Sequence, residues 1–282
     1  MTAVTAAGTD ARPGRPVPLL AGVAVITGRN LRRLVRVPTL LVFATVQPAL
    51  FVLLFTYAFG GAIHVPGTAH YIDYLLPGIF VLAIGFGASQ TGVAIAEDLA
   101  TGMIDRFRSL PITAAAVLAG RVAADALRNL FERAAVIAAT AATPAGRAGG
   151  VGSAIGFRFH AGPAAALAAV ALAVATGLAF SWLNLLLGLA VHDPESAGLA
   201  GLFPVIILFF TSSTLVPVAT MPGWLQAFAR ANPVTVITGA LRALCLGGST
   251  ARPALEAAAW LAGLLAVTVP AAVVSYRHAA ST

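Results

Sequence analysis

A compact group of charged residues lies between two strongly apolar stretches, in the segment "AIAEDLATGMIDRFRSLPITAAAVLAGR" at residues 94–121. If residues 97–110 form a helix, its apolar and polar side chains separate onto two faces. The apolar stripe comprises Leu99, Met103, Phe107 and Leu110, and the opposite side carries Asp98, Thr101, Asp105 and Arg108. Pro111 would then end the helix. We expect such an element to lie at the cytoplasmic surface with one face free to contact another protein. The alternative is a loop whose charges only fix the membrane topology.

Other residues that could support catalysis or metal binding are sparse. The sequence HDPE at residues 192–195 has the order of an N-cap, a first-turn proline and a dipole-favoured acid at the start of a helix, and we prefer that interpretation to a catalytic one. His64 and His70 have no third ligand, so they are weak evidence for a metal. Cys245 is the only cysteine, which excludes an intrachain disulfide and a cysteine-based metal cluster.

The composition places these residues in a membrane protein. Of the 282 residues, 59% are hydrophobic and 10% are charged, and the mean hydropathy is +0.91. An ordinary soluble domain is about 25% charged. The net charge of +7 comes from arginine, because the sequence has no lysine. Arginines flank the apolar runs as the positive-inside rule expects of cytoplasmic loops. No aromatic-interleaved basic surface or finger motif accompanies them, which argues against nucleic-acid binding.

The apolar runs predict an all-α polytopic fold with about six transmembrane helices, each needing about 20 mostly apolar residues. The predicted spans are residues 39–63, 75–96, 134–152, 163–191, 198–218 and 255–276. The third span is marginal, because Glu132, Arg133 and Arg147 interrupt a run of small residues and each charge opposes insertion. It is kept because the arginine cluster at residues 29–36 and the loop with Arg106 and Arg108 are both expected inside, so that a third span is needed to place the later charges.

The residues before the first span predict two further features. Residues 1–18 have the composition of a disordered cytoplasmic tail, and residues 19–282 form one membrane domain. Arg29, Arg32, Arg33 and Arg36 have helical spacing on one face, which predicts an amphipathic helix at the membrane interface. Simple flanking charge without a surface helix is the alternative.

Polar and small residues mark three places inside the predicted spans. Gln47 and Pro48 interrupt the first span, where a proline commonly kinks a helix. Thr211 to Thr214 form a polar run, TSST, whose hydroxyls we expect to satisfy backbone groups of a broken helix, with substrate contact as the alternative. In the second span, two overlapping small-xxx-small pairs favour close packing within the chain over a seam between copies. These pairs are Gly85 with Ser89 and Ala88 with Gly92.

The segment "MPGWLQAFARANP" at residues 221–233 predicts a short helix bounded by Pro222 and Pro233. Trp224, Leu225 and Phe228 would lie on one side of it, as in an interfacial cap. We expect residues 60–74 and 218–233 to face outward. The N-terminus, residues 94–116 and the tail from residue 277 should face the cytoplasm.

The segment "EDLATGMIDRFRSLPI" resembles the pattern that follows the second span of type 2 ABC exporter permeases, especially the daunorubicin and doxorubicin resistance branch. Three further blocks are similar to that branch in the same order: "RNLRRLVRVPTLLVFATVQPALFVLLFTYAFGGAI", "FPVIILFFTSSTLVPVATMPGWLQAFARANPVT" and "ALRALCLGG". The resemblance extends from about residue 19 to the end. Residues 131–156 differ from the corresponding run of the family, which is richer in leucine and valine.

The resemblance implies roles for two sets of residues. The set that would couple the chain to a cytoplasmic ATPase comprises Glu97, Asp98, Gly102, Arg106, Arg108 and Pro111. The set that would close the outer end of the pathway comprises Pro222, Trp224, Leu225, Phe228, Asn232 and Pro233. Coupling of this kind works through surface complementarity and involves no catalysis.

The resemblance also implies the partners. A P-loop needs the lysine of GxxxxGK[ST], and this sequence has no lysine, so ATP and Mg²⁺ would bind a separately encoded ATPase and this chain would hold no cofactor. Two copies would pair in the plasma membrane and export a hydrophobic, drug-like molecule. The alternatives are an ion-coupled secondary transporter, which usually needs ionisable groups deep in the membrane, and a noncatalytic membrane anchor or assembly factor.

Overall fold

The computed structural model describes residues 38–59, 63, 71–102, 117–124, 126–127, 162–191 and 193–279, and these residues are helical with short connections and no strand. The elements are α2 (Pro38–Phe59), α3 (Tyr71–Ala100), α7 (Pro163–Ala190), α8 (Pro194–Phe210), the short 3₁₀ helix η1 (Val218–Thr220), α9 (Gly223–Ala231), α10 (Pro233–Leu246) and α11 (Ala251–Ala279). A further helical stretch covers residues 117–124 and 126–127. The all-α prediction is confirmed for this part of the chain.

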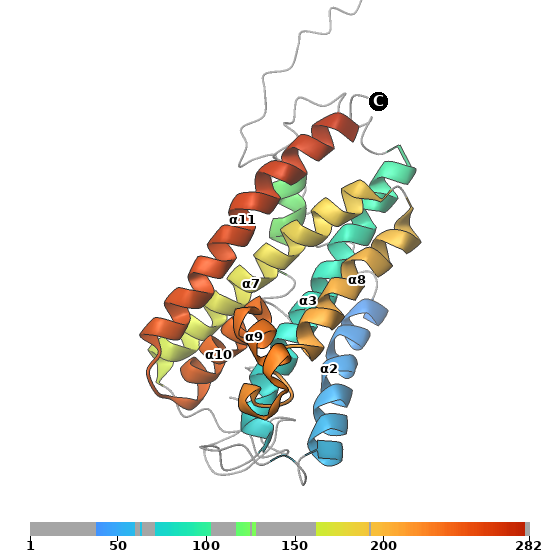
Figure 1. Cartoon of the computed structure of the whole chain (residues 1–282). Helices are drawn as coiled ribbons and strands as arrows, with labels where there is room; N and C mark the ends of the chain where they lie inside the picture. The colour runs from blue at the N-terminus through green and yellow to red at the C-terminus, as the bar shows by residue number, and fades with distance from the viewer. Residues whose placement is uncertain are drawn as a thin grey trace, which may run out of the picture.

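The long helices run along one axis and give the bundle two ends (Figure 1). At the Tyr71 end lie the start of α3, the end of α8 and the connection from α10 to α11; at the Ala100 end lie the ends of α3, α7 and α11 and the start of α8. Helices α3, α7 and α11 are long and apolar enough to cross a membrane. They confirm the predicted spans at residues 75–96, 163–191 and 255–276.

The first and fifth predicted spans are also helical, with different limits. Helix α2 is unbroken through Gln47 and Pro48 and ends at Phe59. Helix α8 ends at Phe210, so the prediction of a span continuing to residue 218 is wrong, because hydroxyl side chains and Pro217 follow. The predicted third span, the tail at residues 1–18 and the arginine-bearing helix at residues 29–36 lie outside the described residues.

Helix α3 is the centre of the bundle and packs against α2, α7, α8 and α10. Glycines allow the closest of these contacts. A methyl group at Gly92 would lie 2.7 Å from the backbone oxygen of Asn184 on α7, and one at Gly85 would lie 2.5 Å from the side chain of Val205 on α8. Gly188 of α7 meets Gly92 from the other side. The small-xxx-small pairs therefore serve packing within the chain, which confirms that interpretation.

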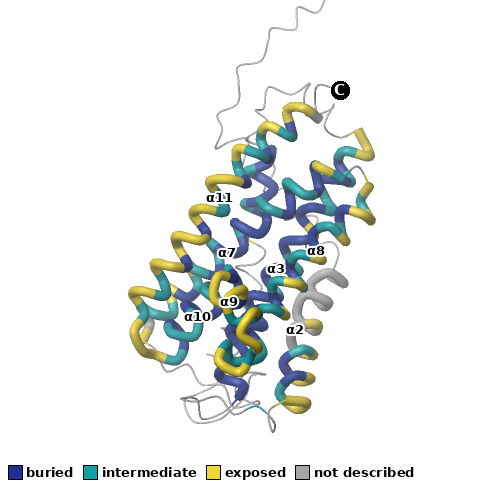
Figure 2. Tube along the Cα trace, in the orientation of Figure 1, coloured by how far each residue is buried: buried dark blue, intermediate teal, exposed yellow. Residues whose placement is uncertain are grey.

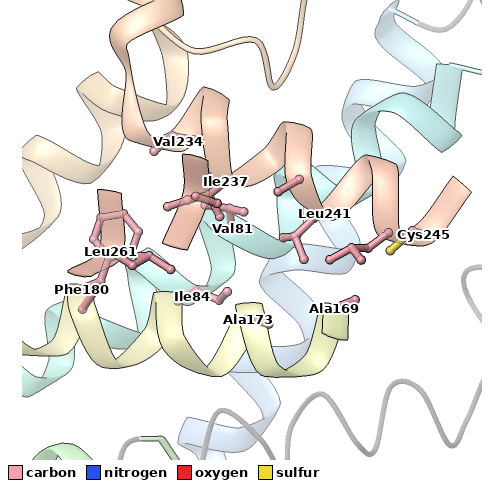
Figure 3. Close-up of a cluster of buried hydrophobic side chains, with 14 of the residues drawn as sticks. Val81, Ile84, Ala169, Ala173, Phe180, Val234, Ile237, Leu241, Cys245 and Leu261 are labelled. Atoms are coloured by element: carbon pink, nitrogen blue, oxygen red, sulfur yellow. The ribbon is translucent and has the colours of Figure 1, made fainter. Parts of the chain in front are cut away.

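Helix α10 was not predicted as a separate element, yet it completes the main apolar cluster. Its side chains Val234, Ile237, Leu241 and Cys245 point toward α3, α7 and α11 (Figure 3). Val234 and Phe180 lie at one end of the cluster and Cys245 and Ala169 at the other, so α10 runs antiparallel to the first part of α7 (Figure 3). The spacing of three or four residues along a helix puts these four side chains on one face.

Helices α8 and α11 have exposed positions along their length (Figure 2), and many of the residues there are large and apolar. On α11 they include Leu255, Trp260, Val267 and Val274, and on α8 they include Leu199, Phe203, Ile207 and Phe210. A helix that is apolar on its exposed face as well as its packed face is typical of a protein surrounded by lipid. The burial pattern therefore agrees with a membrane protein.

Gly92→Leu should destabilise the bundle, because the backbone of α7 leaves no room for a side chain there. Overpacking of a filled core costs about 1–3 kcal/mol, so the midpoint of thermal aggregation of the detergent-solubilised protein should fall. Gly263→Leu is the matched control, since no atom lies within 4 Å of a methyl group at Gly263. An equal midpoint for the two variants would contradict the packing assignment.

Candidate functional site

At the Tyr71 end of the bundle, Arg242 of α10 binds backbone oxygens of α3 and of the segment that follows α8. Its Nε donates to the Tyr74 carbonyl oxygen at 2.8 Å, and its Nη2 donates to the carbonyl oxygens of Ser213 at 2.9 Å and Thr214 at 3.1 Å. The guanidinium carbon also lies 3.5 Å from the centre of the Tyr74 ring. We call Arg242, Tyr74, Ser213 and Thr214 the Arg242 node. A planar fork of donors is suited to binding several carbonyl oxygens at once.

The Arg242 node exists because α8 ends at Phe210 and leaves backbone groups without helical partners. Tyr74 adds a donor, since its hydroxyl donates to the Ser213 carbonyl oxygen at 2.6 Å. The hydroxyl of Thr211 donates to the Ile207 carbonyl oxygen at 2.6 Å, and that of Ser212 donates to the Phe209 carbonyl oxygen at 2.6 Å. The interpretation of the TSST run as satisfying a broken helix is therefore confirmed.

The six residues predicted to close the pathway fall into two groups. Trp224 is 76% exposed and Phe228 is 47% exposed, while Leu225 is intermediate and Pro222 precedes the first turn of α9. In the second group, Asn232 is buried and Pro233 opens α10. The predicted short helix is thus present as α9. Closure of a pathway by these residues stays a prediction.

Asn232 is the joint between α9, α10 and the end of α8. Its Oδ1 accepts a hydrogen bond from the Val234 amide at 2.9 Å and so caps α10. Its Nδ2 donates to the Leu208 carbonyl oxygen at 2.7 Å and to the Thr211 hydroxyl at 3.2 Å. One amide side chain therefore fixes where α10 begins relative to α8, a role that sequence reasoning did not assign to it.

At the Ala100 end, a buried ion pair joins Asp98 of α3 to Arg121 of the helix at residues 117–124. Nη2 of Arg121 donates to Oδ2 of Asp98, and the two side chains are 7% and 13% exposed respectively. Removing one partner of a buried pair costs about 3–5 kcal/mol, whereas replacing both with apolar residues is often neutral. The net contribution of the pair to stability is therefore small compared with the cost of leaving either charge unpaired.

Near this pair in the chain, apolar side chains of α3 and of the helix at residues 117–124 form a buried cluster with side chains of α7 and α11. They are Ile95 from α3, Leu185 and Leu189 from α7, Ala272 and Tyr276 from α11, and Val117, Leu118 and Val122 beside Arg121. We call this set with Asp98 and Arg121 the Asp98–Arg121 cluster. It is the place where the helix at residues 117–124 is anchored to the rest of the described bundle.

The residues predicted to couple to an ATPase are divided by the end of α3. Helix α3 ends at Ala100, and Gly102 follows with a φ of +65°, the left-handed conformation that commonly ends a helix. The predicted continuous helix over residues 97–110 is therefore wrong at this point. Glu97 and Asp98 belong to the last turn of α3, and Asp98 is buried instead of lying on an open polar face.

Arg106, Arg108 and Pro111 lie outside the described residues. Neither Arg121 nor Arg242 was singled out from the sequence. Arg121 and Arg242 each lie among apolar residues in the sequence, which could have indicated a buried arginine. Their partners could not be identified, because they are far away in the sequence.

The segment between α7 and α8 has the predicted helix-opening role. Asp193 accepts a hydrogen bond from the Ser196 amide at 2.8 Å and caps α8, with Pro194 in the first turn. Hydrogen bonds from Ser196, chiefly that from its backbone amide, hold the pKa of Asp193 below its ordinary value. Among the described residues, no three His, Cys, Asp or Glu side chains are grouped as a metal site requires.

Comparison with known proteins gives a family match over most of the chain. Residues 22–246 match the family described as ABC-2 type transporter. The chain is 32% identical to a daunorubicin resistance ABC transporter permease protein of Streptomyces coeruleorubidus, over 86% of this chain and 81% of the relative. It is 26% identical to a probable doxorubicin resistance ABC transporter permease protein of Mycobacterium tuberculosis, over 90% of this chain and 88% of the relative.

Arg242→Met should destabilise the Tyr71 end, because the carbonyl oxygen of the buried Thr214 loses its Arg242 donor and that of Ser213 keeps only the Tyr74 hydroxyl. Leaving a buried acceptor unsatisfied costs about 1–3 kcal/mol, so the thermal midpoint in detergent should fall. Arg252→Met is the control, since the Arg252 side chain is 88% exposed. Unchanged stability of Arg242→Met would show that the node is dispensable for the fold.

Proposed function

The chain belongs to the ABC-2 type transporter family as a membrane permease subunit, and from that premise we propose that it exports a hydrophobic, drug-like molecule with a separately encoded ABC ATPase. The observation that carries this proposal is the match to permeases named for daunorubicin and doxorubicin resistance across more than four-fifths of each chain. Drug-like cargo also suits a bundle whose accessible side chains are mainly apolar.

The energy source must come from a partner in this proposal. The 282 residues contain no lysine, and the P-loop lysine is the residue that reaches the nucleotide phosphates. ATP and Mg²⁺ would therefore bind the ATPase, and this chain would hold no cofactor and catalyse no reaction. Its contribution is the membrane pathway and the surface that receives the motion of the ATPase.

The contact with the ATPase is proposed to lie just beyond α3. Helix α3 delivers Glu97 and Gly102 to the Ala100 end, and Arg106, Arg108 and Pro111 follow in the sequence. Complementary charge at such a surface steers association and fixes orientation. At the opposite end, α9 and its exposed Trp224 and Phe228 would form the outer closure.

Two copies of the chain would form the complete pathway. Leu199, Phe203, Ile207 and Phe210 recur on one exposed face of α8, at the spacing of a helix–helix seam. Helices α2 and α8 both pack on α3, and Val52 and Phe55 of α2 belong to the same buried cluster as Val205 and Phe209 of α8. An apolar face contributed by α2 and α8 would meet the same face of a second copy around a two-fold axis.

We further propose that the Ala100 end faces the cytoplasm of a plasma-membrane protein, with both termini inside. Arg277 lies in the last turn of α11 at this end, Arg106 and Arg108 follow α3 in the sequence, and cytoplasmic flanks carry such charges. Secondary transport driven by ions has less support, since the three carboxylates of α3 lie near its two ends, Asp73 in the first turn and Glu97 and Asp98 near the last. None of them lies at the middle of the span.

The orientation predicts opposite labelling at the two ends. In a Cys245→Ser background, Ser249→Cys should react with a membrane-impermeant maleimide on intact cells, because it lies in the exposed connection between α10 and α11. Thr101→Cys should react only after the membrane is permeabilised. Labelling of Thr101→Cys on intact cells would reverse the proposed topology.

Inside-out vesicles carrying the chain and the ABC ATPase that copurifies with it should accumulate daunorubicin when ATP is supplied. Accumulation should stop when ATP is replaced by a non-hydrolysable analogue or when the chain is omitted. Accumulation driven by a proton or sodium gradient without ATP would support secondary transport. Accumulation that persists without this chain would support an assembly or anchoring role.

A further inference from the structure

The Asp98–Arg121 pair has a position in the chain that its contribution to folding does not explain. The two residues are 23 positions apart. Asp98 lies two residues before the end of α3, and Arg121 lies in the helix that resumes at residue 117. The stretch between them includes Arg106, Arg108 and Pro111, which we have proposed as part of the ATPase contact. The ion pair therefore joins the two helices at the base of that stretch.

The surroundings of the pair hold the contact between α3 and the helix at residues 117–124 in one arrangement. Asp98 and Arg121 are both buried, so neither side chain can rotate freely into solvent. Ala272 and Tyr276 of α11 and Leu189 of α7 pack in the same cluster. A displacement of the Asp98–Arg121 contact should therefore shift α3, α7 and α11 together, because packed interiors transmit strain.

Holding two helices together with a buried ion pair requires the desolvation of two charges, which apolar residues would avoid. A different ion pair, Arg252 with Glu256, lies within a single helix and is largely exposed, at 88% and 52%. The buried pair thus differs from a surface pair in linking two elements and in having fixed geometry. Such a pair is suited to keeping two helices in one relative orientation while a bound partner moves.

We propose that Asp98 and Arg121 are positioning residues for energy coupling, which hold the two helices flanking the ATPase contact as one unit so that its motion reaches α3 and α11. The proposal rests on the proposed function as an ATPase-driven permease. It assigns Asp98 an internal role at the base of the contact and not a direct role in binding the partner.

The test replaces the pair with apolar residues in Asp98→Leu/Arg121→Met. Replacing both partners avoids an uncompensated buried charge, so the protein should insert and copurify with the ATPase as before. Hydrolysis of ATP should continue, while the number of daunorubicin molecules transported per ATP should fall by about tenfold, a size common for coupling between sites. Glu256→Leu/Arg252→Met, which makes the same replacements in the exposed pair, should keep the wild-type ratio.

A normally assembled Asp98→Leu/Arg121→Met complex with the wild-type transport-to-hydrolysis ratio would overturn the proposal and leave the pair a structural contact. If this double variant does not assemble, Asp98→Asn and Asp98→Glu decide the question. Asp98→Glu keeps the charge pair and should retain more of the ratio than Asp98→Asn, which removes the charge at nearly constant shape. Equal ratios for these two variants would also overturn the proposal.

A second measurement tests the role of the pair without depending on the identity of the transported substrate. In a Cys245→Ser background, the maleimide reaction rate of Ala227→Cys on α9 should change when vanadate traps the wild-type complex after hydrolysis. The change should be absent when the Asp98–Arg121 pair is replaced. A wild-type complex that shows this change but moves no daunorubicin would contradict the proposed substrate while supporting the pair's role. A change that survives replacement of the pair would contradict the role itself.

Discussion

The constraint on which the rest of the structure depends is that a backbone surrounded by lipid must find its hydrogen-bond partners within the protein. Long uninterrupted helices meet it in α3, α7 and α11. Helix α8 stops at Phe210, and there the constraint brings in side chains from other elements, with Arg242, Tyr74 and Asn232 donating to the released carbonyl oxygens. The polar residues at the Tyr71 end are thus a consequence of ending one helix inside the bundle, and they fix α10 in place as they do so.

Helix α3 connects the two polar sites of the bundle. Tyr74 near its start belongs to the Arg242 node, and Asp98 near its end belongs to the Asp98–Arg121 cluster. Between them, Gly85 and Gly92 allow α8 and α7 to approach closely, which gives the helix little freedom to move by itself. A shift at one end of α3 must therefore repack its neighbours or displace the other end, as a permease driven from one membrane surface requires.

The sequence predicted the class of protein and most of the long helices, because apolar length and composition are local properties. It also predicted the packing role of the small residues in α3 and the capping role of Asp193. The continuous helix over residues 97–110 was wrong because periodicity does not reveal that Gly102 adopts a positive φ. Helix α10 was missed because its apolar face is short and begins one residue after α9, and its burial depends on α3, α7 and α11.

By itself, the sequence determined three things: that the chain is apolar enough to lie in a membrane, which segments can form its long helices, and which family it resembles. Only the tertiary structure decided which polar residues point inward and what satisfies them. Asp98 was assigned to an open face because the helical pattern contains no information on its partner, and Arg121 is 23 positions away. Arg242 is farther still from Tyr74, at 168 positions. Such partners are set by helix packing, since a buried charge is stable only where distant elements bring it donors or acceptors.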